Sequence, residues 1–152
     1  MSNEYARGED NDGALNPSQD TVAHDAVELE LPAKTAYLPV LRAAIGVVAG
    51  TESFKYDEIV QLRIAVSEAF GLAIDRLDTG SGLSRPGSLK IRCVVAPDSL
   101  EVLVAHPVST IAEESPEEAE GRAVIRSLVD RMELDEDETG AQVLRLVKYR
   151  SA

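Results

Sequence analysis

The chain has 152 residues, of which 44% are hydrophobic and 28% are charged, with 27 acidic against 15 basic side chains and a net charge of −12. This length is enough for one domain with a core of its own. The acidic balance argues against nucleic acid or an anionic membrane as the main partner, because both select basic surfaces. It suits a basic protein partner, and it also keeps a protein soluble without any partner.

The single cysteine, Cys93, excludes an intrachain disulfide and is compatible with a reducing compartment. It lies in an apolar run, where a thiol acts as a small strand hydrophobe. The first residues show no basic stretch followed by an apolar one, and no apolar run approaches the ~20 residues of a membrane span. We therefore expect a cytoplasmic protein without a membrane segment.

The first part of the chain predicts a tail, a strand and a helix. Residues 1–24 are rich in Asn, Asp, Glu and Gly, so we expect a disordered acidic tail before a domain over 25–152, with a regulatory arm as the alternative. In AVELELP, apolar and acidic residues alternate, which is typical of a half-exposed strand ended by Pro32. TAYLPVLRAAIGVVAG has helical apolar spacing, with Thr35 expected as the N-cap and Gly50 as the stop.

The rest of the chain predicts a second helix, a hairpin, a third helix and a second hairpin. The second helix is expected from about Asp57 to Leu77. SLKIRCVVA and SLEVLVA, joined by Pro-Asp, are typical of a hairpin. SPEE is a capping box, with Ser115 as N-cap and Glu118 three residues on, and MELDEDE with AQVLRLVKY indicates the last hairpin. The order βααββαββ predicts an α+β, two-layer fold in which helices cover one face of a mixed or antiparallel sheet.

One carboxylate, Glu68, interrupts the apolar stretch IAVSEAFGLAIDR of the second helix. At ~100° per residue it points nearly opposite the core-facing stripe, and its neighbours there are Ile64, Ala65 and Leu72. A helix that is apolar on two sides is covered on both, so we expect Glu68 in a second, semi-buried pocket. There it either finds an ordinary hydrogen-bond partner or acts as a general base.

These residues carry a resemblance to a known family. YDEIVQLRIAVSEA, followed by LKIRCVVAPDSLEVLVA, is similar to the anti-sigma-factor serine kinases of bacterial stress and sporulation control, a branch of the GHKL ATPases with the Bergerat fold. The resemblance covers about residues 27–149. It implies a protein that binds a sigma factor and uses Mg-ATP to phosphorylate a serine or threonine of a STAS-type anti-anti-sigma partner. It also implies a homodimer.

The nucleotide-binding motifs of this family are degenerate in the chain. Glu68 matches the catalytic base, but Leu72 stands where the family has the asparagine that holds Mg²⁺, and hydrocarbon cannot ligate this cation. His106 replaces the aspartate that holds adenine. Gly121 alone remains of the glycine-rich phosphate loop, among glutamates that would repel a triphosphate. We therefore expect no cofactor, no metal site and no ordinary Mg-ATP kinase activity.

The resemblance leaves a partner-binding surface. Arg42 matches an arginine of the family's first helix that contacts both sigma factor and antagonist, although a solvated helix arginine is the simpler interpretation. Tyr37 and Leu38 lie on the same segment. Three hypotheses follow: an anti-sigma factor of the pseudokinase kind, released by a competing antagonist; a divergent Mg-ATP-dependent serine kinase with Glu68 as base; and a non-catalytic adaptor for STAS-type antagonists. We prefer the first.

Overall fold

The computed structural model describes residues 24–81, 87–108 and 114–151. In chain order the elements are β1 (Ala26–Pro32), the 3-10 helix η1 (Thr35–Tyr37), α3 (Leu38–Thr51), α4 (Tyr56–Ser81), β2 (Ser88–Val95), β3 (Ser99–Ala105), α5 (Pro116–Leu128), β4 (Arg131–Glu136) and β5 (Gln142–Tyr149). The expected tail lies outside the described residues, apart from its last residue. No helix in the described ranges has the length and apolar character that crossing a membrane requires.

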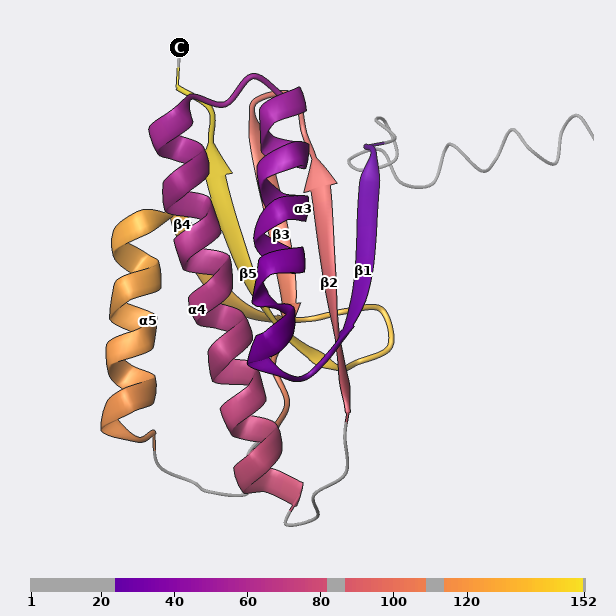
Figure 1. The fold of residues 1–152 in the computed structure, drawn as a ribbon, viewed down its shortest axis with the longest axis vertical. Coiled ribbons are helices and arrows are strands. Elements are labelled where there is room, and N and C mark those ends of the chain that lie inside the picture. Colours follow the sequence, from indigo (N-terminus) through magenta and orange to yellow (C-terminus); the bar gives the residue numbers. More distant parts are fainter. Residues whose placement is uncertain (1–23, 82–86, 109–113, 152) are drawn as a thin grey trace, which may run out of the picture.

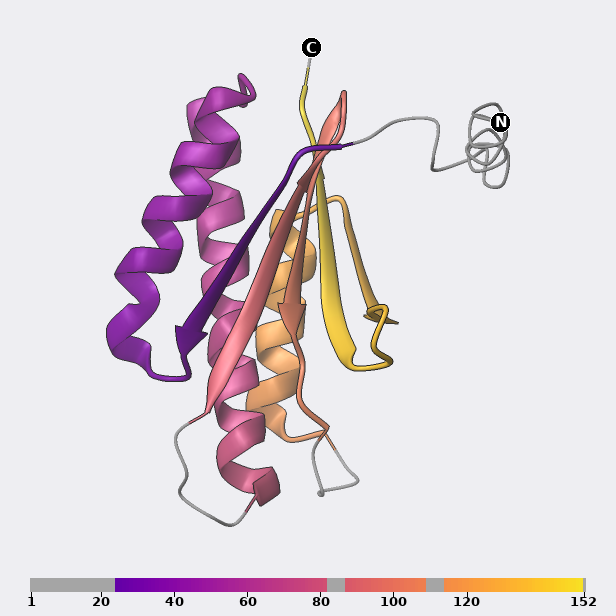
Figure 2. The same cartoon turned by 90° about the vertical axis from the view of Figure 1, so that its right-hand side faces the viewer.

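The strands of the described residues form one antiparallel sheet in the order β1-β2-β3-β5-β4. Figure 1 shows α3, α4 and α5 side by side, and Figure 2 shows all three on the same face of the sheet. This confirms the predicted α+β, two-layer fold. All pairs in this sheet are antiparallel. Hairpins join β2 to β3 and β4 to β5, and helical crossovers join β1 to β2 and β3 to β4.

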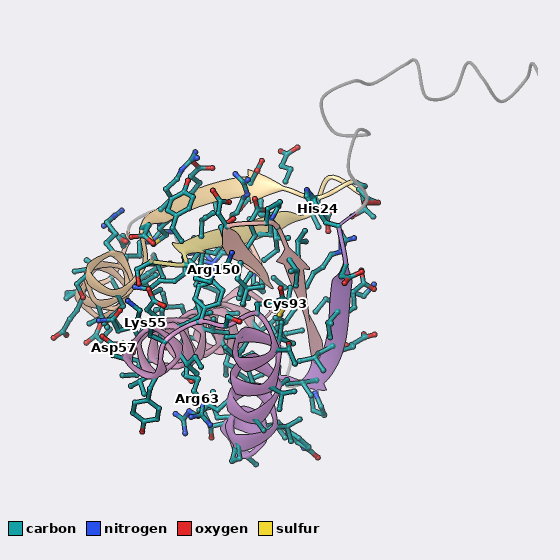
Figure 3. The ribbon with its side chains drawn as sticks, turned by 90° about the horizontal axis from the view of Figure 1, so that it is seen from above. His24, Lys55, Asp57, Arg63, Cys93 and Arg150 are labelled. Carbon is teal, nitrogen blue, oxygen red and sulfur yellow. The ribbon has the colours of Figure 1, made fainter. Side chains whose placement is uncertain are left out.

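The core lies between the sheet and the helices, as the strand alternation predicts. Its largest fully buried apolar side chains come from both layers, and they are Phe70, Leu41, Ile45, Leu62, Leu89, Ile91, Leu100, Ile125, Leu144, Leu146 and Val66. Cys93 is 1% exposed on the helix-facing side of β2 (Figure 3). Burial raises the pKa of its thiol to about 11, so at neutral pH it packs as an uncharged hydrophobe.

No described helix covers the opposite face of the sheet (Figure 2), and this face carries charged side chains. Arg145 donates to Glu101 at 2.8 Å and to Glu133 at 2.9 Å, which links β3, β5 and β4 across this face. A hollow of about 580 Å³ lies beside this network, between β1, β2 and the β4–β5 turn. Both acidic and basic side chains line it, including the exposed ion pair of Arg92 with Glu28. This face therefore needs no covering helix.

Two expected boundaries of the first helix are wrong. Thr35 is not an N-cap: it begins η1, and α3 starts at Leu38 with Pro39 in its first turn. A proline there has its φ already set for a helix and lacks an N–H that would need a partner, so it defines the start. Gly50 does not end the helix either. The helix continues one residue further, to Thr51, and Ser53 then has a φ of 66°.

The end of the described chain is tied to the start of α4 by one buried carboxylate. Glu58 accepts hydrogen bonds from the backbone N–H of Lys55 at 2.8 Å and of Ser151 at 3.0 Å. Burial acts to raise the pKa of Glu58, but these hydrogen bonds outweigh it and hold the pKa below its usual value. Arg150 adds a bond to the carbonyl of Glu52, and Figure 3 looks onto this end of the molecule.

We predict that Glu58→Ala lowers the free energy of unfolding by about 1–2 kcal/mol, because two backbone N–H groups lose their acceptor. Because the pKa of Glu58 is lower in the folded chain than in the unfolded chain, Glu58 contributes fully to the free energy of unfolding at pH values above the ordinary carboxylate pKa. The contribution is lost as the pH falls through the folded value. Urea denaturation at several pH values measures this. Asp57→Ala, in the same turn but without these two bonds, is the control; equal losses for both variants would contradict the prediction.

Candidate functional site

The central helix α4 contacts both flanking helices, α3 on one side and α5 on the other (Figure 1). Three of its residues, Glu68, Leu72 and Arg76, are spaced one turn apart and lie towards α5. Two others, Arg63 and Ser67, lie towards α3. The helix therefore contributes to two sites at once, an interhelical contact with α5 and a groove beside α3.

The contact between α4 and α5 is closest at Gly121. A Cβ at this position would lie 3.0 Å from Leu72 Cδ2 and 3.2 Å from Glu68 Oε2. Leu72 is 5% exposed, so its hydrocarbon packs directly on the backbone of α5. The structure thus brings the base candidate Glu68 together with Leu72 and Gly121 of the degenerate nucleotide site, and it places a buried leucine side chain between the two helices.

Glu68 is half-buried between the groove and the α4–α5 contact. To the residues that the structure describes, its carboxylate makes no hydrogen bond and no ion pair. The expected cover on its side of the helix is incomplete: Leu72 is covered by α5, but Ile64 is 45% exposed. Ala65, expected on that second face, is fully buried in the core. Glu68 therefore lies at the edge of the groove with its charge unpaired within the described chain.

His106 follows the last residue of β3 and is 1% exposed. Its Nε2 lies 3.3 Å from a terminal nitrogen of Arg122 in α5. Burial, and then the charges of Arg76 and Arg122, lower its pKa to about 4, with Glu118 acting in the opposite direction. His106 is consequently a neutral ring at neutral pH. It lies beside α5, and its charged neighbours include the guanidinium groups of Arg76 and Arg122.

Acidic residues surround the start of α5. Ser115 is the N-cap as predicted, and its Oγ accepts a hydrogen bond of 3.0 Å from the N–H of Glu118. Glu117 and Glu118 fill the first turn, and Glu114 lies 3.0 Å from Arg122 Nε. Carboxylates at this end of a helix already satisfy the positive pole of its dipole. Within the described ranges, no group of three or more His, Cys, Asp or Glu side chains is placed to hold a metal ion.

Sequence reasoning missed the ionic cluster that links Arg76, Arg122 and Glu118. Only part of it had a signal in the sequence: Glu118 and Arg122 are four residues apart on one helix, the spacing of an intrahelical ion pair. Arg76 lies 42 residues before Glu118, and nothing local predicts that the two meet.

A groove of about 460 Å³ separates α3 from α4 on the side away from the sheet. Arg42 donates from Nε to Ser67 Oγ at 2.9 Å, and Arg63 donates from Nε to the carbonyl of Arg42 at 3.1 Å. Figure 3 shows Arg63 on this outer side. Among the described residues neither arginine forms an ion pair with a carboxylate, although the chain carries 27 acidic residues.

Apolar side chains border the two arginines. The groove is lined by Leu38, Arg42, Val60, Arg63, Ile64, Ser67, Glu68 and Gly71. Of the residues assigned to partner binding, Arg42 and Leu38 line it, and Tyr37, 37% exposed, precedes them at the start of α3. Val40 and Val47 are 47% and 66% exposed on the same helix. Unpaired cations beside exposed hydrocarbon are typical of a protein-binding surface.

No family model matches the chain. Curated relatives do match it. The serine-protein kinase RsbW of Bacillus pumilus (strain SAFR-032) is 36% identical over 81 residues, that of Bacillus subtilis (strain 168) 37% over 81, and that of Listeria monocytogenes serovar 1/2a (strain ATCC BAA-679 / EGD-e) 33% over 82. These matches support the similarity of this chain to an RsbW-like family. The resemblance deduced from the sequence is thereby confirmed.

The similarity to RsbW is partial in extent. The three matches cover 53%, 53% and 54% of this chain and 49%, 49% and 50% of the relatives. The chain thus spans about half the length of the curated relatives it matches. Their name describes a serine-protein kinase.

We predict that Gly121→Ala lowers the free energy of unfolding by up to about 2 kcal/mol. Overpacking against buried Leu72 costs about 1–3 kcal/mol, and the helix preference of alanine within α5 offsets about 1 kcal/mol of this. Leu72→Ala alone costs about 2–5 kcal/mol through the cavity it leaves. The double variant loses less than the sum of the two, because the methyl group enters space that Leu72 vacated.

Urea denaturation of the four proteins measures this coupling. Gly71→Ala is the matched control, because nothing lies within 4 Å of a Cβ there and the helix gains stability from alanine. Strict additivity of the two single changes would show that Leu72 and Gly121 do not depend on each other.

Proposed function

We propose that the chain is an RsbW-like anti-sigma factor that sequesters a sigma factor by protein–protein binding, without binding Mg-ATP and without kinase activity. The observation that carries this proposal is the packing of Leu72 on Gly121. Release of the sigma factor then depends on a STAS-type anti-anti-sigma protein that competes for the same surface. In this proposal the protein regulates transcription in a bacterial stress response.

Three features support the loss of nucleotide binding. Leu72 offers hydrocarbon where the family needs an amide oxygen for Mg²⁺. The side chain of Leu72 also fills the space beside Gly121, the remaining glycine of the phosphate motif. Glu117 and Glu118 repel phosphate from the start of α5, where a phosphate would otherwise bind the free N–H groups. These residues do not fit a Mg²⁺-bound triphosphate, and phosphoryl transfer requires that metal and phosphate be positioned together.

The groove beside α3 supports partner binding at the surface expected from the family. Arg42 and Arg63 present guanidinium groups without carboxylate partners among the described residues, and Leu38 and Ile64 supply hydrocarbon beside them. Arginine and partly exposed apolar residues are common at the centre of protein interfaces. The net charge of −12 would in addition steer the chain towards basic regions of a sigma factor. A homodimer and a cytoplasmic location remain expectations from the family.

Isothermal titration calorimetry with Mg-ATP and Mg-ADP tests the loss of nucleotide binding. We expect no saturable heat up to about 1 mM ligand, which corresponds to less than about 4 kcal/mol of binding free energy. The RsbW protein of Bacillus subtilis, measured under the same conditions, is the positive control. Micromolar binding to the present chain would overturn the proposal.

Capture of purified sigma factors tests the partner. We expect one sigma factor of the source organism to bind, and Arg42→Glu to weaken that binding at least tenfold, because it reverses the charge at the centre of the groove. Arg126→Glu, an exposed change on α5, is the control for net charge. Unchanged capture by Arg42→Glu would exclude this groove. Binding of STAS-type proteins but of no sigma factor would favour the adaptor hypothesis.

A divergent Mg-ATP-dependent serine kinase is the second candidate, and one observation favours it. The carboxylate of Glu68 is half-buried at the groove and unpaired within the described chain, as a general base would be. Phosphate transfer from Mg-ATP to a STAS-type protein, abolished by Glu68→Ala, would establish this activity. Without such transfer the first proposal stands.

A further inference from the structure

Glu118 lies at the centre of an ionic cluster on the side of α4 that faces α5. A single oxygen, Oε2, forms an ion pair with Arg76 of α4, lies 3.8 Å from Arg122 Nη2, and lies 4.0 Å from His106 Nε2. Arg76 also donates to the carbonyl of Pro107. One carboxylate therefore joins α4, α5 and the segment that follows β3.

The cluster is shielded from solvent. The exposed fractions of the side chains are 1% for His106, 15% for Glu118, 17% for Arg76 and 21% for Arg122. By contrast, Glu114, which pairs with Arg122 at the outer edge, is 42% exposed. An ion pair in such a position is strong only while both charges are present, because a shielded cation left alone is costly. Removing Glu118 would take away the shielded carboxylate that lies between Arg76 and Arg122, while Arg122 would keep the more exposed Glu114.

The position of Glu118 in its helix does not require this arrangement. In a capping box, the carboxylate at the third helical position reaches back to the N–H of the N-cap residue. Here the N–H of Glu118 does donate to Ser115 Oγ, but the carboxylate oxygen that pairs with Arg76 points across to α4. The exposed neighbour Glu117 already supplies negative charge to the helix end. Glu118 thus serves a contact between elements.

We infer that Glu118 is an internal anionic ligand: its carboxylate occupies an oxyanion site formed by the guanidinium groups of Arg76 and Arg122, next to His106, and holds α5 against α4 without a bound small molecule. The site has the chemistry for a small carboxylate or a phosphate, and Glu118 fills it. The inference rests on the proposed function for its biological meaning. It explains how α5 stays packed against α4 at the degenerate nucleotide site when no nucleotide is present. The neutral state of His106 leaves the two guanidinium groups as the source of positive charge.

Chemical rescue of Glu118→Ala in the full chain tests the inference. We expect the thermal midpoint to fall by about 5–10 °C in sodium chloride at pH 7, because a shielded ion pair between α4 and α5 is broken. Sodium acetate at 100 mM and matched ionic strength should restore at least half of the loss by refilling the site. Sodium phosphate is the second probe and separates the two classes of oxyanion. Wild type should respond equally to acetate and chloride.

Two further variants make the result decisive. Glu117→Ala removes a neighbouring charge without opening a site, so acetate should not rescue it. Glu118→Gln keeps the side-chain volume, so it should be destabilised but insensitive to acetate. If Glu118→Ala does not fold in chloride, folding in acetate supports the inference. Absence of acetate or phosphate rescue overturns it. Absence of rescue would not affect the proposed loss of nucleotide binding. Conversely, Mg-ATP binding by the wild type would overturn the proposed loss of nucleotide binding but would not affect the interpretation of acetate rescue.

Discussion

The arrangement of the helices depends on the contact between Leu72 and the bare backbone at Gly121. A buried leucine contributes about 1.5–3 kcal/mol when it leaves water, and here that gain is available only because the facing residue has no side chain. The contact sets how closely α5 approaches α4. The ionic cluster around Glu118 forms one turn further along the same two helices, so the hydrocarbon contact and the ion pairs reinforce each other.

The two sides of α4 differ in a way that suits a binding protein. Towards α5, Arg76 and Glu118 are paired and shielded, and the hydrocarbon of Leu72 fills the interior. Towards α3, Arg42 and Arg63 have no carboxylate partner in the described chain and lie beside exposed apolar side chains. The first side is closed by the chain's own groups, with Glu68 at its edge. The second has guanidinium groups and uncovered hydrocarbon together at the surface, a combination common at protein interfaces.

Local patterns predicted most of the fold, because each depends on residues close together in the chain. Period-2 alternation identified β1, helical spacing identified α3 and α4, and the capping box placed Ser115 at the start of α5. The boundaries at Thr35 and Gly50 failed because a 3-10 turn and a left-handed residue, Ser53, override the residue preferences. For the candidate site, sequence similarity selected Glu68, Leu72, His106 and Gly121. It could not predict the Arg76–Glu118 pair, which depends on how two helices pack.

Gly46 of α3 influences the position of one charged side chain of the groove, Arg63. The guanidinium of Arg63 lies over this glycine, where an added Cβ would be 3.3 Å from Nε. The obstructing atoms belong to the far end of a flexible side chain, so the chain can absorb a larger residue there at small cost. Such a change would turn Arg63 away from the carbonyl of Arg42 and redirect its charge. Gly46 is therefore a position at which a substitution can alter the charge pattern of the groove at little cost to the stability of the fold.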